Sequence, residues 1–229
     1  MTLYLKAGPD GESVGDCPFA HYIRIILHEK NLPYTPRPCL PDTKPSWLID
    51  FYEGKMPALR HRSECYTESD VIAEYLEFFF SKDQMSLIPT LSEEKKGYQE
   101  GKELAGLIFA PIAKYLKSTE DDSEEDRQRK DALCEVLAQL EGRLTAEGRT
   151  GPYVCGTGEA LTLVDCSLAP KLFHMKIGLQ HFKSNVLDVS MEYPAVAAYM
   201  EMMFARESFQ ASLYPEETVI WGWSNARSS

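Results

Sequence analysis

The sequence predicts an α/β N-terminal half followed by an all-helical C-terminal half. Residues 2–7 and 34–40 are β-prone apolar runs, and prolines within the second run favour an edge strand. A run with helical spacing of apolar residues follows the first strand at 18–30, and a shorter helix follows the second strand at 44–50. This alternation indicates a βαβ unit.

The first half ends in a predicted hairpin and a helix. Residues 54–59 lead into a third strand, and residues 65–67 pair back on it. Ser69 is predicted to N-cap a helix that runs through Phe79. The expected order is therefore βαβα-ββα, with a mixed sheet. Beyond residue 90 the pattern is helical, and the predicted helices cover 91–117, 126–146, 162–178 and 192–211.

These patterns predict two domains within the 229 residues. We expect the α/β domain over residues 1–81 and the all-α domain over residues 91–229. Residues 82–90 resemble a connector, because turn-forming and polar side chains interrupt the helical pattern there.

The charge of the chain limits its partners. With 24 basic and 35 acidic side chains the formal net charge is −11, which argues against nucleic acid or an anionic membrane surface as a partner. Basic side chains slightly outnumber acidic ones only in residues 1–63. A local basic excess would suit an anionic small molecule, although an acidic solvated surface with chance variation explains the same numbers.

The six cysteines indicate a reduced protein without a metal site. They show no paired spacing of the disulfide-scaffold or zinc kind, and the chain has no Cys-x-x-Cys motif. Residues 1–4 lead directly into the first strand, so we expect no secretory signal peptide. No apolar run approaches the roughly 18 residues that span a bilayer. These observations predict a cytoplasmic protein with no membrane partner.

Cys17 is the candidate reactive group. Pro18 suits the first position of a helix, so Cys17 is predicted at the N-cap, facing unpaired backbone N–H groups and the positive end of the helix dipole. A thiol in that place is expected to ionise near neutral pH. The partner position of a two-cysteine redox centre holds Ala20, so any second sulfur must come from elsewhere.

Three further patterns are interpreted as structural. Six of the seven residues at 120–126 are acidic, which predicts a solvated loop. Thr162 and Asp165 form a capping-box variant at the start of a helix. The aromatic tail at 218–223 is expected to pack back on the body of the protein.

Several motifs together resemble one family. A βαβ-ββα unit with Cys-Pro at its first helix and X-Pro before its third strand resembles a thioredoxin fold, and the helical half makes the chain similar to the glutathione transferase superfamily. Within it, the chain resembles the dehydroascorbate reductases, the cysteine-type members, with chloride intracellular channel proteins as close relatives. The resemblance covers about residues 3–223. The matching residues are Lys6, 15–19, 44–47, 54–57, 69–72, 167–172 and 206–209.

The resemblance implies a site for oxidised ascorbate around one nucleophile. Cys17 would be the nucleophile, and Lys6 and Asp16 would hold the substrate beside its sulfur. Pro18 and Phe19 would line the substrate pocket. No bound cofactor is implied, because glutathione serves as the cosubstrate, and a monomer is expected.

The resemblance also implies a glutathione site. Lys44 and Lys55 would meet its glycyl carboxylate, and Met56 would pair with its backbone as an added strand. Pro57 is expected to be cis. Ser69 and Glu68 would bind the γ-glutamyl end, Ser69 with the help of a helix N-terminus. Glu68 stands where the family usually has Asp.

Two departures and two alternatives accompany this interpretation. The family commonly has Ser-Gln-Arg after the Phe, where this chain has Ala20, His21 and Tyr22. Cys39 is an extra thiol whose distance from Cys17 the sequence leaves open.

The expected activity is reduction of dehydroascorbate by a single-cysteine ping-pong mechanism. The alternatives are an omega-like thiol transferase or deglutathionylase, and a non-catalytic, channel-like redox switch.

Overall fold

The computed structural model describes residues 1–80, 86–156, 160–183 and 186–228. Two compact units divide the chain, residues 1–86 with 207–222 and residues 87–206 with 223–229. The first change of unit falls within the predicted connector at 82–90, of which residues 82–85 lie outside the described residues. The segment 207–222 groups with the N-terminal unit.

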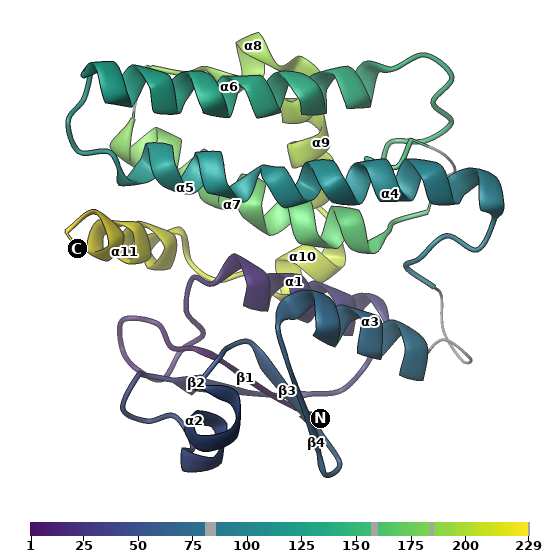
Figure 1. Ribbon diagram of the computed structural model, residues 1–229, viewed down its shortest axis with the longest axis vertical. Coiled ribbons are helices and arrows are strands. Elements are labelled where there is room, and N and C mark those ends of the chain that lie inside the picture. The colour runs from purple at the N-terminus through teal and green to yellow at the C-terminus, as the bar shows by residue number, and fades with distance from the viewer. Residues whose placement is uncertain (81–85, 157–159, 184–185, 229) are drawn as a thin grey trace. The chain divides into compact units, whose positions relative to one another are not determined.

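The N-terminal unit contains a mixed sheet in the strand order β2-β1-β3-β4. Its strands are β1 (Thr2–Lys6), β2 (Thr35–Cys39), β3 (Ala58–His61) and β4 (Glu64–Thr67), and its first helices are α1 (Pro18–Glu29), α2 (Ser46–Tyr52) and α3 (Ser69–Phe79). Strand β1 pairs parallel with β2 and antiparallel with β3, and β3 and β4 form the predicted hairpin. The proline-rich β2 lies at the edge, as predicted. Figure 1 shows α1 and α3 on one face of this sheet and α2 on the other.

The core of this unit forms where the sequence periodicity predicts it. Ile23, Ile26 and Leu27 on α1 are fully buried, as are Leu3 and Leu5 on β1. The fold class predicted for this half is confirmed.

The segment 207–222 adds α10 (Glu207–Ala211) and the first residues of α11 (Glu216–Arg227) to the N-terminal unit. His21 on α1 is fully buried against it: its Nε2 lies 3.0 Å from Ser212 Oγ, and its ring centroid lies 4.7 Å from that of Phe209 and 5.0 Å from that of Tyr214. His21 therefore belongs to the core. The sequence patterns did not predict that residues 216–227 form a helix.

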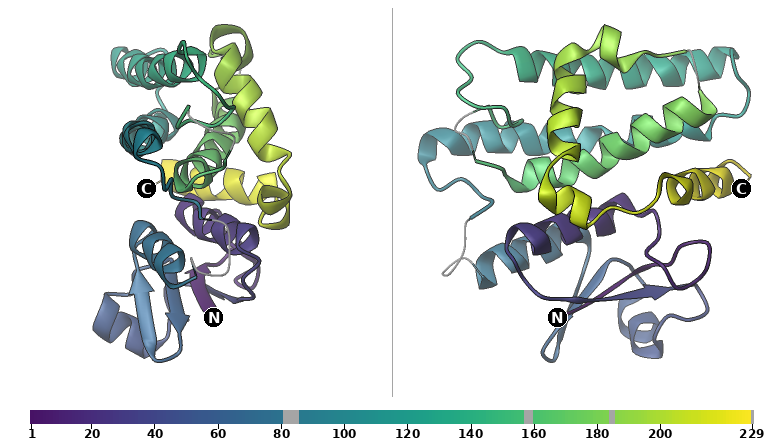
Figure 2. Two further views of the ribbon diagram at one scale, coloured as in Figure 1. Left: turned by 90° about the vertical axis from the view of Figure 1, so that its right-hand side faces the viewer. Right: turned by 180° about the vertical axis from the view of Figure 1, so that it is seen from behind.

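The second unit is helical, as predicted, and its helices are seen from two further sides in Figure 2. They are α4 (Ser92–Leu107), α5 (Phe109–Lys117), α6 (Glu124–Thr145), α7 (Leu163–Phe182), α8 (Val189–Glu192) and α9 (Pro194–Phe204). Helix α7 is buried along most of its length and contacts α4, α5 and α9. No helix within the described residues is both long and apolar enough to cross a membrane.

Two predicted helices are broken in the structure. The helix predicted over 91–117 divides at Ile108, because Pro111 cannot donate a hydrogen bond to the carbonyl of Leu107 and its ring crowds that carbonyl. The prediction of one continuous helix over 192–211 is also wrong, because α9 covers only the middle of that range. That helix starts at Pro194, which suits a first helical position, and it ends at Phe204 before the separate α10.

The acidic block at 120–126 is not a solvated loop throughout. Ser123 caps α6 by accepting a hydrogen bond from the N–H of Asp126, and Asp126 is buried. The ammonium of Lys183, itself buried, pairs with Asp126 at 2.7 Å and also with Asp121. The prediction failed because the cation that pairs with these acids lies far away in the sequence. By contrast, the capping box of Thr162 and Asp165 is confirmed.

Candidate active site

Cys17 lies at the N-cap of α1, with Pro18 as the first helical residue, as predicted. The loop from β1 brings it there by folding back on the strand: Ala7 forms a β-bridge with Val14, and the N–H of Gly15 donates to the carbonyl of Lys6 at 2.8 Å. A Cβ atom at Gly15 would approach the carbonyl oxygen of Ala7 to 2.5 Å. Only glycine therefore allows the chain to pass so close to the end of β1 before it reaches Cys17.

The groups around the Cys17 thiol shift its pKa in opposite directions. Burial raises the pKa of Cys17, the backbone N–H groups of Ala20 and Phe19 lower it, the Asp16 carboxylate raises it, and the Lys6 ammonium lowers it. Burial outweighs the helix N-terminus, so the pKa lies above the ordinary value for a cysteine. The expectation of a thiol that ionises near neutral pH is therefore wrong, because burial holds the pKa of Cys17 above its ordinary value.

Lys6 and Asp16 form an ion pair beside the thiol. The ammonium lies 2.6 Å from Asp16 Oδ1, and the carboxylate is buried while about half of the lysine side chain is exposed. The same ammonium lies 5.1 Å from the ring centroid of Trp221. The hydroxyl of Tyr214 donates to the backbone carbonyl of Asp16 at 3.3 Å. Charges of both signs are thus fixed close to the sulfur.

A pocket of about 520 Å³ opens on Cys17. Four of the predicted site residues line it, namely Lys6, Cys17, Lys44 and Met56, and Trp221 forms a further part of its wall. Asp16 joins the site through Lys6. Pro18 is buried at the start of α1, and Phe19 is 37% exposed. Neither Pro18 nor Phe19 lines this pocket.

The residues predicted to bind glutathione lie around the start of β3 and of α3. The Met56–Pro57 peptide bond is cis. Lys55 Nζ lies 3.6 Å from a carboxylate oxygen of Glu68 and 3.6 Å from one of Glu53. Lys44 donates to the carbonyl of Gly54 at 2.8 Å. Both lysines thus already have acceptors that an anionic ligand would have to displace or share.

The prediction that Ser69 is an N-cap is wrong. Glu68 occupies the N-cap with a left-handed φ of 67°, and Ser69 is the first residue of α3. Glu68 is the one residue between β4 and α3, and its backbone is not helical, so the helix begins at Ser69. In that position Ser69 offers its own N–H at the helix N-terminus as well as a hydroxyl.

Comparisons with known proteins show the family of the chain. The sequence profile described as glutathione S-transferase, N-terminal domain, matches residues 16–77, and that of the C-terminal domain matches residues 126–201. Glutathione S-transferase DHAR2 of Arabidopsis thaliana is 32% identical over 213 residues, which are 93% of this chain and 91% of that relative. The chain belongs to the DHAR group of the glutathione S-transferase family. Glutathione S-transferase DHAR3, chloroplastic, of the same plant is 31% identical over 92% of this chain and 74% of its own length.

A solved structure supports the same membership. The crystal structure of Chlamydomonas reinhardtii dehydroascorbate reductase is similar with a TM-score of 0.79 and 29% identity, and the match covers 98% of this chain and 97% of that chain. The thioredoxin-like domain and the helical domain expected of a glutathione S-transferase are therefore both present. The roles of individual site residues stay predictions.

Two thiols line the pocket of this glutathione S-transferase. Cys39 ends β2 directly beside Lys6 in the sheet register, is buried, and donates to the carbonyl of Arg37 at 3.4 Å. Burial raises its pKa, and Lys44 lowers it. Both Cys17 and Cys39 are free thiols.

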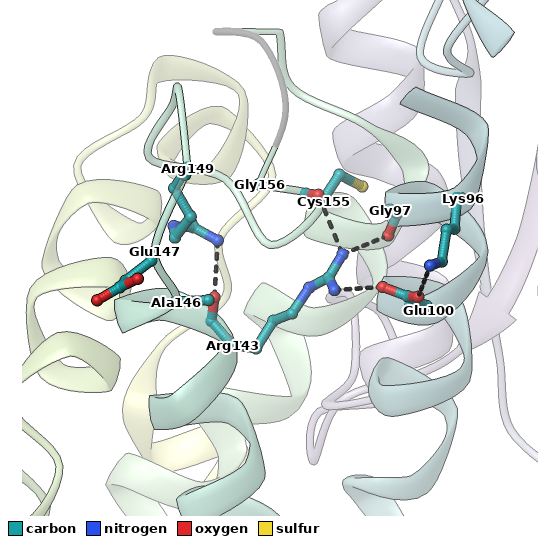
Figure 3. Close-up of a pocket in the computed structure, with 10 residues that line it drawn as sticks. Lys96, Gly97, Glu100, Arg143, Ala146, Glu147, Arg149, Cys155 and Gly156 are labelled. Atoms are coloured by element: carbon teal, nitrogen blue, oxygen red, sulfur yellow. Dashed lines mark hydrogen bonds and ion pairs between the residues drawn. The ribbon is translucent and has the colours of Figure 1, made fainter. Parts of the chain in front are cut away.

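A second pocket, of about 250 Å³, lies in the helical unit (Figure 3). Its arginines are occupied by the chain itself. Arg143 donates to the carbonyls of Gly97, Val154 and Cys155 and pairs with Glu100 at 2.6 Å. Arg149 donates to the carbonyl of Arg143 and to those of two neighbouring loop residues. These contacts hold the loop after α6 in place. Across the described part of the chain, no cluster of metal-binding side chains is found.

Sequence reasoning missed Tyr214 and Trp221 as members of the site. The aromatic tail was expected to pack on the body, but nothing in its pattern indicates what it packs against. Their contacts with residues 6 and 16 join positions some two hundred residues apart, which periodicity does not reveal.

Proposed function

We propose that the protein reduces dehydroascorbate to ascorbate at Cys17, with electrons from two molecules of glutathione. The observation that carries the proposal is an N-cap thiol, Cys17, in a pocket that Lys6, Lys44 and Met56 also line. The names of the relatives agree with this substrate.

In the first half-reaction the Cys17 thiolate gives up two electrons. Dehydroascorbate takes up those electrons together with a proton from water and leaves as the ascorbate anion. The remaining hydroxide oxygen becomes bonded to sulfur, which is left as a sulfenic acid. Lys6 would stabilise the negative charge that develops on the departing ascorbate. The Phe19 and Ala20 N–H groups favour the thiolate that starts the step.

Two glutathione molecules complete the cycle. The thiol of the first displaces hydroxide from the sulfenic acid, which releases water and leaves a Cys17–glutathione disulfide. The thiolate of the second attacks the glutathione sulfur of that disulfide, releases glutathione disulfide and returns the Cys17 thiolate. Ala20 stands where a two-cysteine centre has its second sulfur, one helical turn from Cys17, so α1 supplies no resolving thiol and glutathione takes that role. Alternating substrates predict ping-pong kinetics.

The direct test is the ultraviolet absorbance of ascorbate formed by the purified protein, with and without glutathione. We expect glutathione-dependent formation that Cys17→Ser abolishes and Cys65→Ser leaves unchanged, since Cys65 is a half-buried free thiol on β4 of the same unit. Most activity remaining in Cys17→Ser would overturn the mechanism. Faster turnover of a glutathionylated peptide would instead favour a thiol transferase, and vesicle binding with feeble turnover a channel-like protein.

Two finer expectations belong to this proposal. We expect a monomer, which size-exclusion chromatography with light scattering would test. We also expect the cytoplasm as the compartment. Relatives are described both as cytosolic and as chloroplastic, so localisation of the protein in cells is the measurement that decides between the two.

A further inference from the structure

We propose that Trp221 and Gly222 of α11 are positioning residues that hold the Lys6–Asp16 ion pair beside Cys17 for the reaction proposed above. Both belong to the segment 207–222, which is part of the same compact unit as Cys17. None of the motifs that point to the family's chemistry includes either residue.

Gly222 makes room for the Asp16 carboxylate. A Cβ atom on Gly222 would overlap both the Oδ2 and the Cγ atoms of Asp16, so the carboxylate lies directly against the backbone of α11. Glycine inside a helix is less stable than alanine by about 1 kcal/mol. The backbone of Gly222 is helical and does not need a positive φ. The neighbouring carboxylate, and not the helix, therefore accounts for glycine at this position.

Trp221 bounds the other side of the pair. The Lys6 ammonium lies between the Asp16 carboxylate, 2.6 Å away, and the face of the Trp221 ring, whose centroid is 5.1 Å away. An ammonium over an indole face is attracted by the ring's quadrupole. Trp221, Lys6 and Cys17 line the same pocket, so the ring contacts the ammonium at the pocket wall.

The pair matters because its two charges act on the thiol in opposite directions. The charged and titratable groups that face Cys17 are Lys6, Asp16 and Tyr214, and Lys44 and Cys39 line the same pocket. Tyr214 also fixes the backbone at Asp16 through its hydrogen bond to the carbonyl. A shift of the carboxylate away from its place against Gly222 would therefore change the field at the sulfur.

The first test is the pH dependence of Cys17 alkylation by iodoacetamide, followed by mass spectrometry of the Cys17 peptide. We expect Gly222→Ala to shift the midpoint of this profile. Gly106→Ala is the matched control, because it adds the same methyl to a helical glycine with no atom within 4 Å of that methyl, and it should leave the midpoint in place. In an Asp16→Ala background the effect of Gly222→Ala should vanish. An unchanged midpoint, or an equal shift without the carboxylate, overturns the proposal.

The second test keeps the proposal falsifiable if Gly222→Ala does not fold. Trp221→Leu should raise the KM for dehydroascorbate about two- to fivefold, as expected for loss of a partly exposed cation–π contact, and leave the KM for glutathione unchanged. Trp221→Phe should restore most of the affinity. Trp47→Leu removes another tryptophan that faces a cation, Arg60, at 5.4 Å in the same unit, and should change neither KM. Equal changes in both KM values overturn the positioning role. Because alkylation needs no dehydroascorbate, the first test stands even if the proposed reaction fails.

Discussion

The ammonium of Lys6 and the carboxylate of Asp16 lie 2.6 Å apart and act in opposite directions on the thiol of Cys17. Lys6 lowers the pKa of Cys17 and Asp16 raises it, so the two charges partly cancel at the sulfur. The reactivity of the thiol therefore depends on how the pair is held as much as on the helix N-terminus.

Substitutions of the two partners should move the thiol in opposite directions. Lys6→Gln removes a charge that favours the thiolate, so the pKa of Cys17 should rise and alkylation at pH 7 should slow. Asp16→Asn removes a charge that disfavours the thiolate, so the pKa should fall and alkylation should become faster. The measurement is the rate of iodoacetamide labelling of Cys17 between pH 5 and pH 10. Shifts of the same sign in both variants would contradict this account.

Ser69→Ala should weaken glutathione binding. If the hydroxyl and the N-terminus of α3 bind the γ-glutamyl carboxylate, loss of one hydrogen bond to a charged group should raise the KM for glutathione about tenfold. The rate at saturating glutathione should change little, because the contact is the same in the ground and transition states. Ser92→Ala, at the first residue of α4, is the matched control. An unchanged KM for glutathione would remove Ser69 from the site.

Lys30→Met should destabilise the N-terminal unit. The ammonium of Lys30 lies 2.8 Å from a carboxylate oxygen of Glu77, and both side chains are almost fully buried between α1 and α3. Removal of one partner leaves a buried charge and should lower the free energy of unfolding by about 3–5 kcal/mol. The double variant Lys30→Met/Glu77→Leu should recover much of this loss. Urea unfolding followed by circular dichroism measures both values, and equal stability of the single and double variants would argue against the pair.

The contact of Lys183 with Asp126 should make part of the free energy of unfolding depend on pH. Burial alone would raise the pKa of Asp126, but hydrogen bonds from Lys183 and Ser118 outweigh it, and the pKa lies below its ordinary value of 3.8. A lowered folded-state pKa stabilises the protein above pH 3.8, and this contribution is lost as the pH falls below that value.

Lys183→Met tests this dependence. The variant should be less stable than the natural sequence at pH 7, and the difference should shrink as the pH falls below 3.8, where Asp126 becomes protonated. Lys176→Met, which removes a cation from α7, the helix that Lys183 caps, is the control and should show no such pH dependence. A stability difference that is constant with pH would contradict the role of Asp126.

Most of the features that the sequence predicted correctly depend on residues that are neighbours in the chain. Cys17 at the N-cap with Pro18 after it, the edge position of β2 and the capping box of Thr162 each depend on neighbours in the chain, and all three are confirmed. Pro111 is a local signal too, but the helical periodicity on both sides of it hid the break at Ile108.

The features that the sequence could not predict depend on distant residues. The buried pairing of Asp126 needs Lys183, and the burial that raises the pKa of Cys17 comes from tertiary packing. The places of Trp221 and Gly222 are set by residues 6 and 16. Periodicity indicates which face of a helix or strand is apolar, and caps indicate where a helix begins or ends. Neither indicates which other element packs against that face.

The position of Gly222 in the middle of α11, about two hundred residues after Cys17 in the chain, has a consequence for synthesis. During translation Cys17 leaves the ribosome long before the residues that complete its surroundings, so the nascent chain carries the nucleophile without Tyr214, Trp221 or the backbone that fits against Asp16. The pKa of the thiol therefore reaches its final value only when α11 packs against Asp16. Chains that are interrupted before residue 222 would therefore contain the cysteine without the residues that hold Lys6 and Asp16 beside it.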